Sequence, residues 1–434
     1  MTTSPPVVPS ATTAVRIIGG RPLSGQIAVQ GSKNIALHLY AATLLADEPV
    51  TLCRTPNITD TQVCARILRH IGAGVEEGNE RFAVTPADIV NPIVDLELGR
   101  RVRTSAVLGA AVLARAGRTT FPLPGGDAFC PRYIDRHLNA MSAAGAQVRI
   151  ENGCVRAWFG TGGPRSFRTD VGTPYGPSLG ATVSALLLAA RAPGTSLIVH
   201  PSIEPEVLDT AQFLASGGVG VAWDREGLHV TGTDRIGGGV FTVAGDRIEA
   251  ATMVMATAAT GGSVHLEGIS PAEFPDGLVS VMADAGIALH ETPSGTRALP
   301  FRELIAVRTA TGPHPGLPTD TQPQLTALLT QARGVSRIEE RVYPRRDTHV
   351  TELRRFGAIL SSGDHGISVH GPTRLHGAEA QAEDIRAVTA LVIAALIAPE
   401  PSTIRGMYHL RRGYGRLLDN LVTLGADISI DQET

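Results

Sequence analysis

The sequence predicts an α/β protein built as two globular domains, each made of three repeated βαβ-type units. Two families of repeated segments and a globular composition predict this fold class. Of the 434 residues, 43% are hydrophobic and 18% are charged, which leaves enough apolar side chains for sizeable cores. Six units of about 70 residues exceed a single core, so two globules of three units are expected. A long solenoid is the alternative, but the units are large and lack distinct polar caps.

The first repeated segment is a helical pattern that ends in glycine and continues into a short apolar alternation. Its six copies are LRHIGAGV, MSAAGAQV, LASGGVGV, MADAGIAL, LRRFGAIL and LVTLGADI, with Gly72, Gly145, Gly218, Gly286, Gly357 and Gly425. Successive glycines are 68 to 73 residues apart. Each glycine is expected in the left-handed conformation just past the end of a helix, with a strand following at once.

The second repeated segment is a helix rich in alanine and leucine that leads through a short turn into a β-prone run. Its copies occupy residues 41–52, 110–121, 185–199, 255–266, 327–338 and 394–404. These helices are apolar nearly all round, which predicts that they are buried inside the domains.

Composition excludes several classes of protein. The net charge of −3 argues against a general nucleic-acid binder. No apolar run reaches the length that spans a bilayer, so no membrane association is expected. Residues 1–14 have no basic region followed by an apolar one, and we expect a flexible leader there, not a signal peptide. The four cysteines form no CxxC pair and suit a reducing cytoplasm.

One basic residue is singular. The chain has 38 basic residues, of which Lys33 is the only lysine. Either one lysine codon survived by chance, or position 33 needs a compact ammonium that the planar guanidinium of arginine cannot imitate.

Four segments carry a resemblance to a known family. They are GSKNIAL (31–37), LPGGDAFCPRYIDRH (123–137), PHPGLPTDTQPQ (313–324) and RRGYGRLLDNL (411–421). They resemble UDP-N-acetylglucosamine enolpyruvyl transferase, and the linking stretches extend the resemblance over nearly the whole chain. The resemblance implies an inside-out α/β barrel architecture, with residues 33–245 as the first, nucleotide-side domain. The second domain would combine residues 15–32 with 246–434, and the two domains would close on ligand.

The resemblance also implies the reaction. The enolpyruvyl group of phosphoenolpyruvate would pass to a hydroxyl of a uridine nucleotide, with no metal and no organic cofactor. A trianionic substrate needs several cations, an acid near its C3 and a base near the acceptor hydroxyl. The cations implied around phosphoenolpyruvate are Lys33, Arg103, Arg132, Arg386 and Arg412. For any single arginine, the alternative is a solvated surface charge.

The acid departs from the family pattern. Most members carry a cysteine directly after LPGG, where this chain has Asp127, and some members carry aspartate. An aspartate can protonate carbon only if its pKa is raised by burial or by a neighbouring anion. Cys130 is the alternative acid, and a plain turn residue is the alternative role for Asp127. Asp320 is the implied base, and a helix N-cap is its alternative role.

The nucleotide would be bound by residues of both predicted domains. The resemblance implies Asn34, Arg132, Asp135, His137, Ser178, Gly180, Asp320 and Val342. A helix is expected to begin at Ser178, so its first amide groups would offer a site for nucleotide phosphate. A lone histidine such as His137 is more often packed or solvated than a ligand.

The acceptor stays open between two nucleotides. Some family members have a lysine that reaches the diphosphate where this chain has Gly176. The pair Pro344–Arg345 stands where the family often has glutamate followed by a small or polar residue, and Arg411 replaces a common acidic residue. These changes make the C-terminal part of the site more cationic. UDP-N-acetylglucosamine, for cell-wall precursor synthesis, is the first expectation. The 3′-hydroxyl of UMP, in nucleoside-antibiotic biosynthesis, is the second. A catalytically silent nucleotide-binding paralogue is a third alternative, although Lys33, Asp127 and Asp320 are all present.

Overall fold

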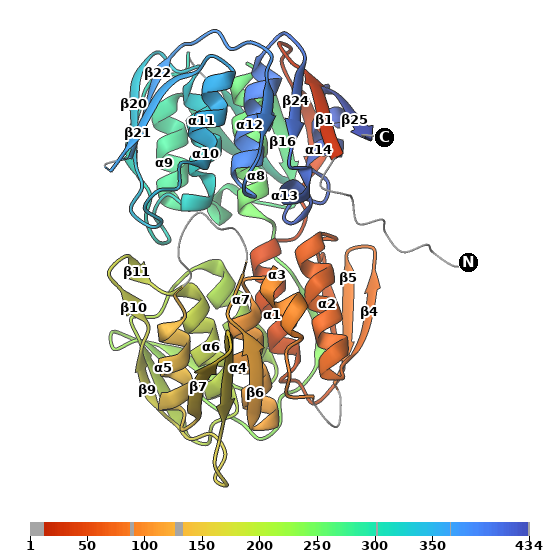
Figure 1. Ribbon diagram of the computed structural model, residues 1–434, viewed down its shortest axis with the longest axis vertical. Helices are drawn as coiled ribbons and strands as arrows, with labels where there is room; N and C mark the ends of the chain where they lie inside the picture. The colour runs from red at the N-terminus through yellow and green to blue at the C-terminus, as the bar shows by residue number, and fades with distance from the viewer. Residues whose placement is uncertain (1–12, 87–90, 126–132, 301–302, 365, 433–434) are drawn as a thin grey trace, which may run out of the picture. The chain divides into compact units, whose positions relative to one another are not determined.

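The chain divides into two compact units (Figure 1). The computed structural model describes residues 13–86, 91–125, 133–300, 303–364 and 366–432. Unit 1 combines the chain up to Val29 with the chain from Gly245 onward, and unit 2 is Gln30–Ala244. Each unit has its own cluster of buried hydrophobic side chains. The protein is a mixed α/β protein, as predicted, and its described helices include none long and apolar enough to cross a membrane.

Unit 2 packs helices against three main sheets. Its helices are α1 (Lys33–Thr43), α2 (Thr59–Ile71), α3 (Leu96–Arg101), α4 (Ser105–Ala116), α5 (Asp135–Ala143), α6 (Leu179–Ala190) and α7 (Pro205–Ser216). Its strands are β3 (Val50–Cys53), β4 (Gly74–Gly78), β5 (Arg81–Thr85), β6 (Arg118–Pro122), β7 (Gln147–Glu151), β8 (Cys154–Trp158), β9 (Arg168–Asp170), β10 (Gly172–Thr173), β11 (Gly176–Pro177), β12 (Thr195–Val199), β13 (Gly220–Trp223), β14 (Leu228–Thr231) and β15 (Gly239–Thr242). The strand orders are β15-β3-β5-β4, β6-β8-β7 and β13-β14-β12-β9, with β10-β11 as a separate hairpin.

Unit 1 also has three sheets among the described residues. Its helices are α8 (Arg247–Ala259), α9 (Asp276–Ala285), α10 (Gln322–Leu329), α11 (Thr348–Arg355), α12 (Ala387–Ile397), α13 (Met407–Arg411) and α14 (Leu417–Thr423), with 3₁₀ turns η1 (Pro271–Glu273) and η2 (Thr319–Thr321). Its strands are β1 (Thr13–Ile18), β2 (Ser24–Ala28), β16 (Ser263–Glu267), β17 (Ile287–Thr292), β18 (Gly295–Pro300), β19 (Arg308–Ala310), β20 (Gly334–Glu339), β21 (Ile359–Gly363), β22 (Gly366–Gly371), β23 (Glu379–Gln381), β24 (Ser402–Arg405) and β25 (Asp427–Gln432). The strand orders are β23-β24-β1-β25, β17-β18-β16-β2 and β19-β20-β22-β21.

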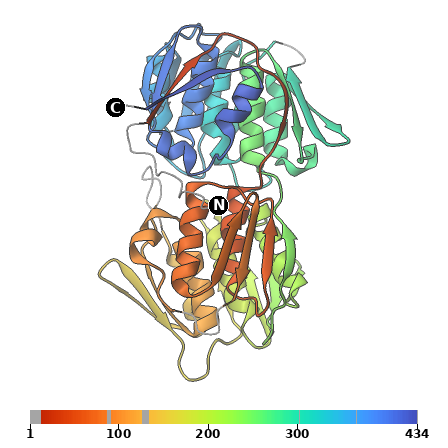
Figure 2. The same ribbon diagram turned by 90° about the vertical axis from the view of Figure 1, so that its right-hand side faces the viewer.

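The alanine- and leucine-rich helices are buried, as predicted. They are α1, α4, α6, α8, α10 and α12, and nearly every residue of each is buried. In unit 1, α8, α10 and α12 contact one another pairwise. Figure 2 shows the strands of each unit on the outer sides of its helices. A helix surrounded in this way must be apolar on every face, which explains why these helices show no polar stripe.

The six repeated glycines all adopt the predicted left-handed conformation. Gly72, Gly145, Gly218, Gly286, Gly357 and Gly425 have φ values between 86° and 114°. Each one lies at or one residue past the C-cap of a helix and precedes a strand of the same unit. Glycine avoids the clash of Cβ with the backbone at such φ values, so it ends the helix and turns the chain into the strand.

Candidate active site

The only lysine of the chain lies at the start of a buried helix and is ion-paired. Ser32 caps α1, and Lys33 is its first residue. The Nζ atom of Lys33 lies 2.9 Å from Oδ2 of Asp60 in the first turn of α2, and the two side chains are only 10% and 6% exposed. A buried ion pair holds both groups in a defined geometry because separating them would leave an uncompensated charge. The sequence did not single out Asp60, since nothing marks it apart from other helix-starting aspartates.

His137 packs against the start of α6. Its Nδ1 atom forms a 2.8 Å hydrogen bond with Oγ of Ser184. A Cβ atom at Gly180 would lie 2.9 Å from Cε1 of His137, so this close approach requires glycine. Burial, together with the nearby charges of Arg103 and His38, lowers the pKa of His137 to about 3. The imidazole is therefore neutral at physiological pH, and it contacts α6 as a packed ring.

Ser178 begins α6, as predicted. Its side chain caps the helix by accepting a 3.4 Å hydrogen bond from the amide of Ala181. Gly176, two residues earlier, has a φ of 108° in the β10–β11 hairpin. A lysine at this position would be strained in that conformation.

The remaining predicted residues of unit 2 differ in burial. Asn34 is half-buried on α1, Arg103 is exposed between α3 and α4, and Asp135 is exposed at the start of α5. Asp127, Cys130 and Arg132 lie outside the described residues.

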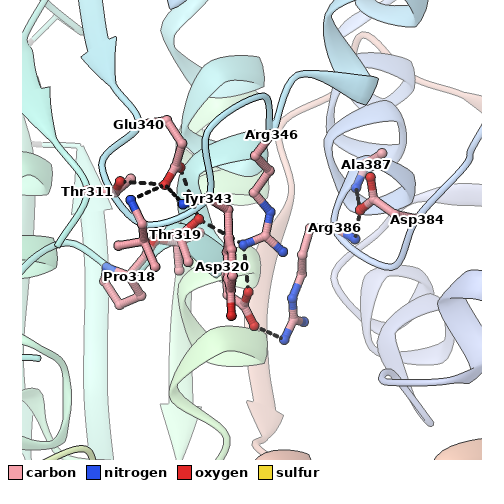
Figure 3. A network of polar contacts seen from close by, with 12 residues as sticks. Thr311, Pro318, Thr319, Asp320, Glu340, Tyr343, Arg346, Asp384, Arg386 and Ala387 are labelled. Carbon is pink, nitrogen blue, oxygen red and sulfur yellow. Dashed lines mark hydrogen bonds and ion pairs between the residues drawn. The ribbon is translucent and has the colours of Figure 1, made fainter. Parts of the chain in front are cut away.

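In unit 1, Asp320 is the centre of a charged network (Figure 3). Its Oδ1 atom accepts a 2.8 Å hydrogen bond from Arg346, and its Oδ2 atom accepts a 2.6 Å hydrogen bond from Arg386. Both arginine side chains are buried, with 3% and 5% exposure. Burial alone would raise the pKa of Asp320, but the two guanidiniums outweigh burial and hold that pKa far below its usual range. Asp320 is thus ionised at neutral pH while both guanidiniums contact it.

The alternative role of Asp320 as the N-cap of the following helix is wrong. Asp320 lies in the 3₁₀ turn η2, and α10 begins at Gln322 with Thr321 as its N-cap. Both oxygens of the carboxylate accept hydrogen bonds from guanidinium groups instead.

Arg386 is positioned by its own helix end and by a tyrosine. Oδ1 of Asp384 accepts hydrogen bonds from the amides of Arg386 (2.8 Å) and Ala387 (2.9 Å), which fixes the start of α12. The guanidinium donates a 2.7 Å hydrogen bond to the hydroxyl of Tyr414. Arg412, two residues before Tyr414, is buried at the C-terminal end of α13. The predicted residues Arg386 and Arg412 therefore belong to segments joined through Tyr414.

Val342 lies in a loop that an acidic side chain organises. Oε1 of Glu340 accepts hydrogen bonds from the amides of Val342 and Tyr343, both at 2.9 Å. Val342 is half-buried. Sequence reasoning missed Arg346, Tyr414 and Glu340. Nothing in the sequence distinguishes the buried Arg346 from the exposed Arg345 directly before it.

Comparison with known proteins places this chain in a family. Residues 17–421 match the family model described as EPSP synthase (3-phosphoshikimate 1-carboxyvinyltransferase). The UDP-N-acetylglucosamine 1-carboxyvinyltransferase of Chlorobium limicola is 37% identical over 415 residues, covering 95% of this chain and 97% of the relative. The UDP-N-acetylglucosamine 1-carboxyvinyltransferase 3 of Symbiobacterium thermophilum is 38% identical and covers 97% of this chain and 99% of its own length.

Solved structures agree on the fold. The enolpyruvyl transferase NikO from Streptomyces tendae superposes with a TM-score of 0.87 at 26% identity, covering 97% of this chain and 99% of NikO. An EPSP synthase from Acinetobacter baumannii superposes with a TM-score of 0.77 at 17% identity, covering 97% of this chain and all of that one, and it supports the fold alone. The chain therefore belongs to the enolpyruvyl (1-carboxyvinyl) transferase family and is an enzyme that transfers a carboxyvinyl group.

Proposed function

We propose that the acceptor is UDP-N-acetylglucosamine and that the enzyme supplies a peptidoglycan precursor. The observation that carries this proposal is the identity of 37 to 38% over at least 95% of the chain with transferases named for that acceptor. Among the described residues, each unit has three main sheets and three buried helices, which supports the family's inside-out barrel architecture.

In the proposed reaction, phosphoenolpyruvate is bound by cations. Lys33, Arg103 and Arg132 of unit 2 and Arg386 and Arg412 of unit 1 serve this one substrate. Guanidinium groups match the carboxylate and phosphate oxygens in pairs, while Lys33 supplies a compact point charge. The pairing of Lys33 with Asp60 supports the lysine's role, because it fixes the ammonium in place.

The first proposed step is protonation of C3 of phosphoenolpyruvate. Asp127 gives its proton to C3 of phosphoenolpyruvate, which makes C2 electrophilic, and the acceptor hydroxyl then attacks C2. The hydroxyl proton passes to Asp320 as the new carbon–oxygen bond forms. The bond between C2 and the phosphate oxygen then breaks, and phosphate leaves with the proton that Asp320 had accepted. C3 returns a proton to Asp127, which restores the vinyl group.

Asp320 must become more basic before it can accept that proton. Arg386 and Arg346 both bind its carboxylate, which makes it a weak base. An anionic substrate that binds Arg386 would draw the guanidinium away from Asp320 and raise the basicity of the carboxylate. The base would thereby become effective only when phosphoenolpyruvate is bound.

The nucleotide is proposed to bind Asn34, Arg132, Asp135, Ser178 and Gly180 of unit 2, with His137 behind Gly180. Asp320 and Val342 of unit 1 would contact it as well. The amide groups at the start of α6, where Ser178 is the N-cap, are the proposed donors for a nucleotide phosphate.

A second acceptor is favoured by one specific observation. Gly176, with its φ of 108°, replaces a lysine that some family members use to reach a diphosphate, and the chain has no other lysine than Lys33. This change favours UMP, whose single phosphate needs no such lysine, with transfer to its ribose 3′-hydroxyl. For either acceptor we propose a cytoplasmic location, which suits the free thiols of Cys53, Cys64 and Cys154.

The test is phosphate release from phosphoenolpyruvate with each acceptor in turn. Release with UDP-N-acetylglucosamine and not with UMP supports the first proposal, and the reverse result replaces it with the second. No release with any uridine nucleotide would contradict both proposals and favour the silent paralogue.

A further inference from the structure

Glu340 is a carboxylate with four hydrogen-bond donors around it (Figure 3). In addition to the amides of Val342 and Tyr343, Oε1 accepts a 2.7 Å hydrogen bond from the hydroxyl of Thr311, and Oε2 accepts a 3.0 Å hydrogen bond from the hydroxyl of Thr319. These donors come from the end of β19, from η2 and from the loop after β20. Glu340 therefore ties three separate segments to one point, and one of them carries Asp320.

The hydrogen bonds of Thr319 have a fixed direction. A threonine hydroxyl has one proton to donate, an ionised carboxylate can only accept, and a guanidinium can only donate. Thr319 must therefore give its proton to Oε2 of Glu340, and its oxygen accepts the 2.9 Å hydrogen bond from Nη1 of Arg346. The same Nη1 atom lies 2.8 Å from Oδ1 of Asp320. The order of contacts is Glu340, Thr319, Arg346, Asp320.

A second path joins the same residues. Oε1 of Glu340 holds the amide of Tyr343, and the guanidinium carbon of Arg346 lies 5.7 Å from the centre of the Tyr343 ring. Arg346 therefore rests against two groups that Glu340 fixes, one polar and one aromatic.

We propose that Glu340 and Thr319 are positioning residues of the transferase, which hold Arg346 against Asp320 through a one-way hydrogen-bond relay. The proposal rests on the assignment of Asp320 as the base in the proposed function. Neither residue touches substrate in this proposal. They act by keeping the guanidinium, and with it the carboxylate, in one orientation, and misplacement of such groups by about 1 Å can lower a rate about 100-fold.

The relay is tested by changing its polarity without changing its shape. Thr319→Val keeps the volume and removes both hydrogen bonds, while Thr319→Ser keeps the hydroxyl. Glu340→Gln places an amide donor where Thr319 needs an acceptor. Thr319→Val and Glu340→Gln are expected to lower kcat about 10- to 100-fold with little change in KM for phosphoenolpyruvate. Thr319→Ser is expected to stay near the wild-type kcat.

The matched control is Glu339→Gln, which makes the same chemical change at the neighbouring residue. Glu339 pairs with Arg341 at an exposed position, so its loss should leave kcat unchanged. Wild-type turnover by Thr319→Val would overturn the relay. So would an equal loss in Thr319→Ser, because a polarity effect must be rescued by the hydroxyl.

A second measurement judges the relay without turnover. The thermal unfolding midpoint is measured for Glu340→Gln, for Arg346→Met and for the two substitutions combined. The same three measurements are repeated in a chain that also carries Thr319→Val. Because the contact through Tyr343 also joins Glu340 to Arg346, the relay requires a non-additivity that is larger in the otherwise wild-type chain than in the Thr319→Val variant. The same degree of non-additivity in both backgrounds, or none in either, would overturn it. A wild-type enzyme without phosphate release would contradict the proposed function instead, so the two failures are distinguishable.

Discussion

At the scale of single residues, unit 1 places one carboxylate between two buried guanidiniums. Asp320 is 26% exposed, whereas Arg346 and Arg386 are almost completely buried. Two arginines in such surroundings repel each other unless an anion lies between them. Asp320 therefore stabilises the folded protein as well as serving the proposed chemistry, and the substrate anion would take over part of that role.

The Asp320→Asn variant should be less stable by about 3 kcal/mol at pH 7, because it removes the charged carboxylate that both Arg346 and Arg386 contact. The pKa of Asp320 is depressed in the folded state. Its contribution is therefore complete above the unfolded-state pKa of about 3.9 and is lost as the pH falls toward the lower folded-state value. Urea unfolding at pH 7 and at pH 3 to 4 should show the gap between wild type and variant shrinking in acid.

Asp419→Asn is the matched control for that experiment, since Asp419 is exposed on α14. It should change stability by no more than about 0.5 kcal/mol at any pH. A gap for Asp320→Asn that stays constant from pH 7 to pH 3 would contradict the depressed pKa.

A second prediction at this scale concerns the lone lysine. Lys33→Arg keeps the charge but places a planar, larger group in the buried contact with Asp60, where the ammonium fits at 2.9 Å. We expect kcat/KM for phosphoenolpyruvate to fall at least about 100-fold. The control is Arg81→Lys at an exposed ion pair, which should leave kcat/KM unchanged. Near-normal turnover of Lys33→Arg would show that position 33 needs only a positive charge.

At the scale of helices and strands, features that depend on local sequence were predictable and long-range contacts were not. The glycine helix ends and the buried helices follow from cap geometry and apolar composition, which act within a few residues. The surroundings of Asp320 do not follow from its local sequence. Arg346 and Arg386 lie 26 and 66 residues further along the chain, and they take the carboxylate away from the helix cap that its local sequence suggests.

The helix-end glycines give a prediction that isolates backbone conformation from packing. Gly218 has a φ of 102°, and a Cβ atom there would meet nothing within 4 Å. Gly218→Ala should therefore lower the free energy of unfolding of unit 2 by about 1 to 2 kcal/mol through backbone strain alone. Gly160 is equally open but has no positive φ, so Gly160→Ala is the control. Equal effects of the two substitutions in denaturant unfolding would refute this explanation.

At the scale of the whole molecule, each unit is completed by a pairing between distant parts of the chain. In unit 2, β15 pairs in parallel with β3, with Gly239 opposite Val50. In unit 1, β2 pairs in parallel with β16, with Ser24 opposite Ser263. The repeats predict how many units to expect, but they do not say which strand pairs with which, because strand partners are chosen by packing that the local pattern does not encode.

Separate cores predict separate responses to core damage. Leu187 on α6 is completely buried in the core of unit 2, so Leu187→Ala should cost about 2 to 5 kcal/mol there. Hydrogen exchange followed by mass spectrometry should show faster exchange in peptides from α4 and α6 and unchanged exchange in α8, α10 and α12. Leu208→Ala on α7 is the control, because that side chain is 42% exposed and its loss should have little effect. Equal acceleration in the helices of unit 1 would mean that the two cores unfold as one cooperative body, which their separate buried clusters argue against.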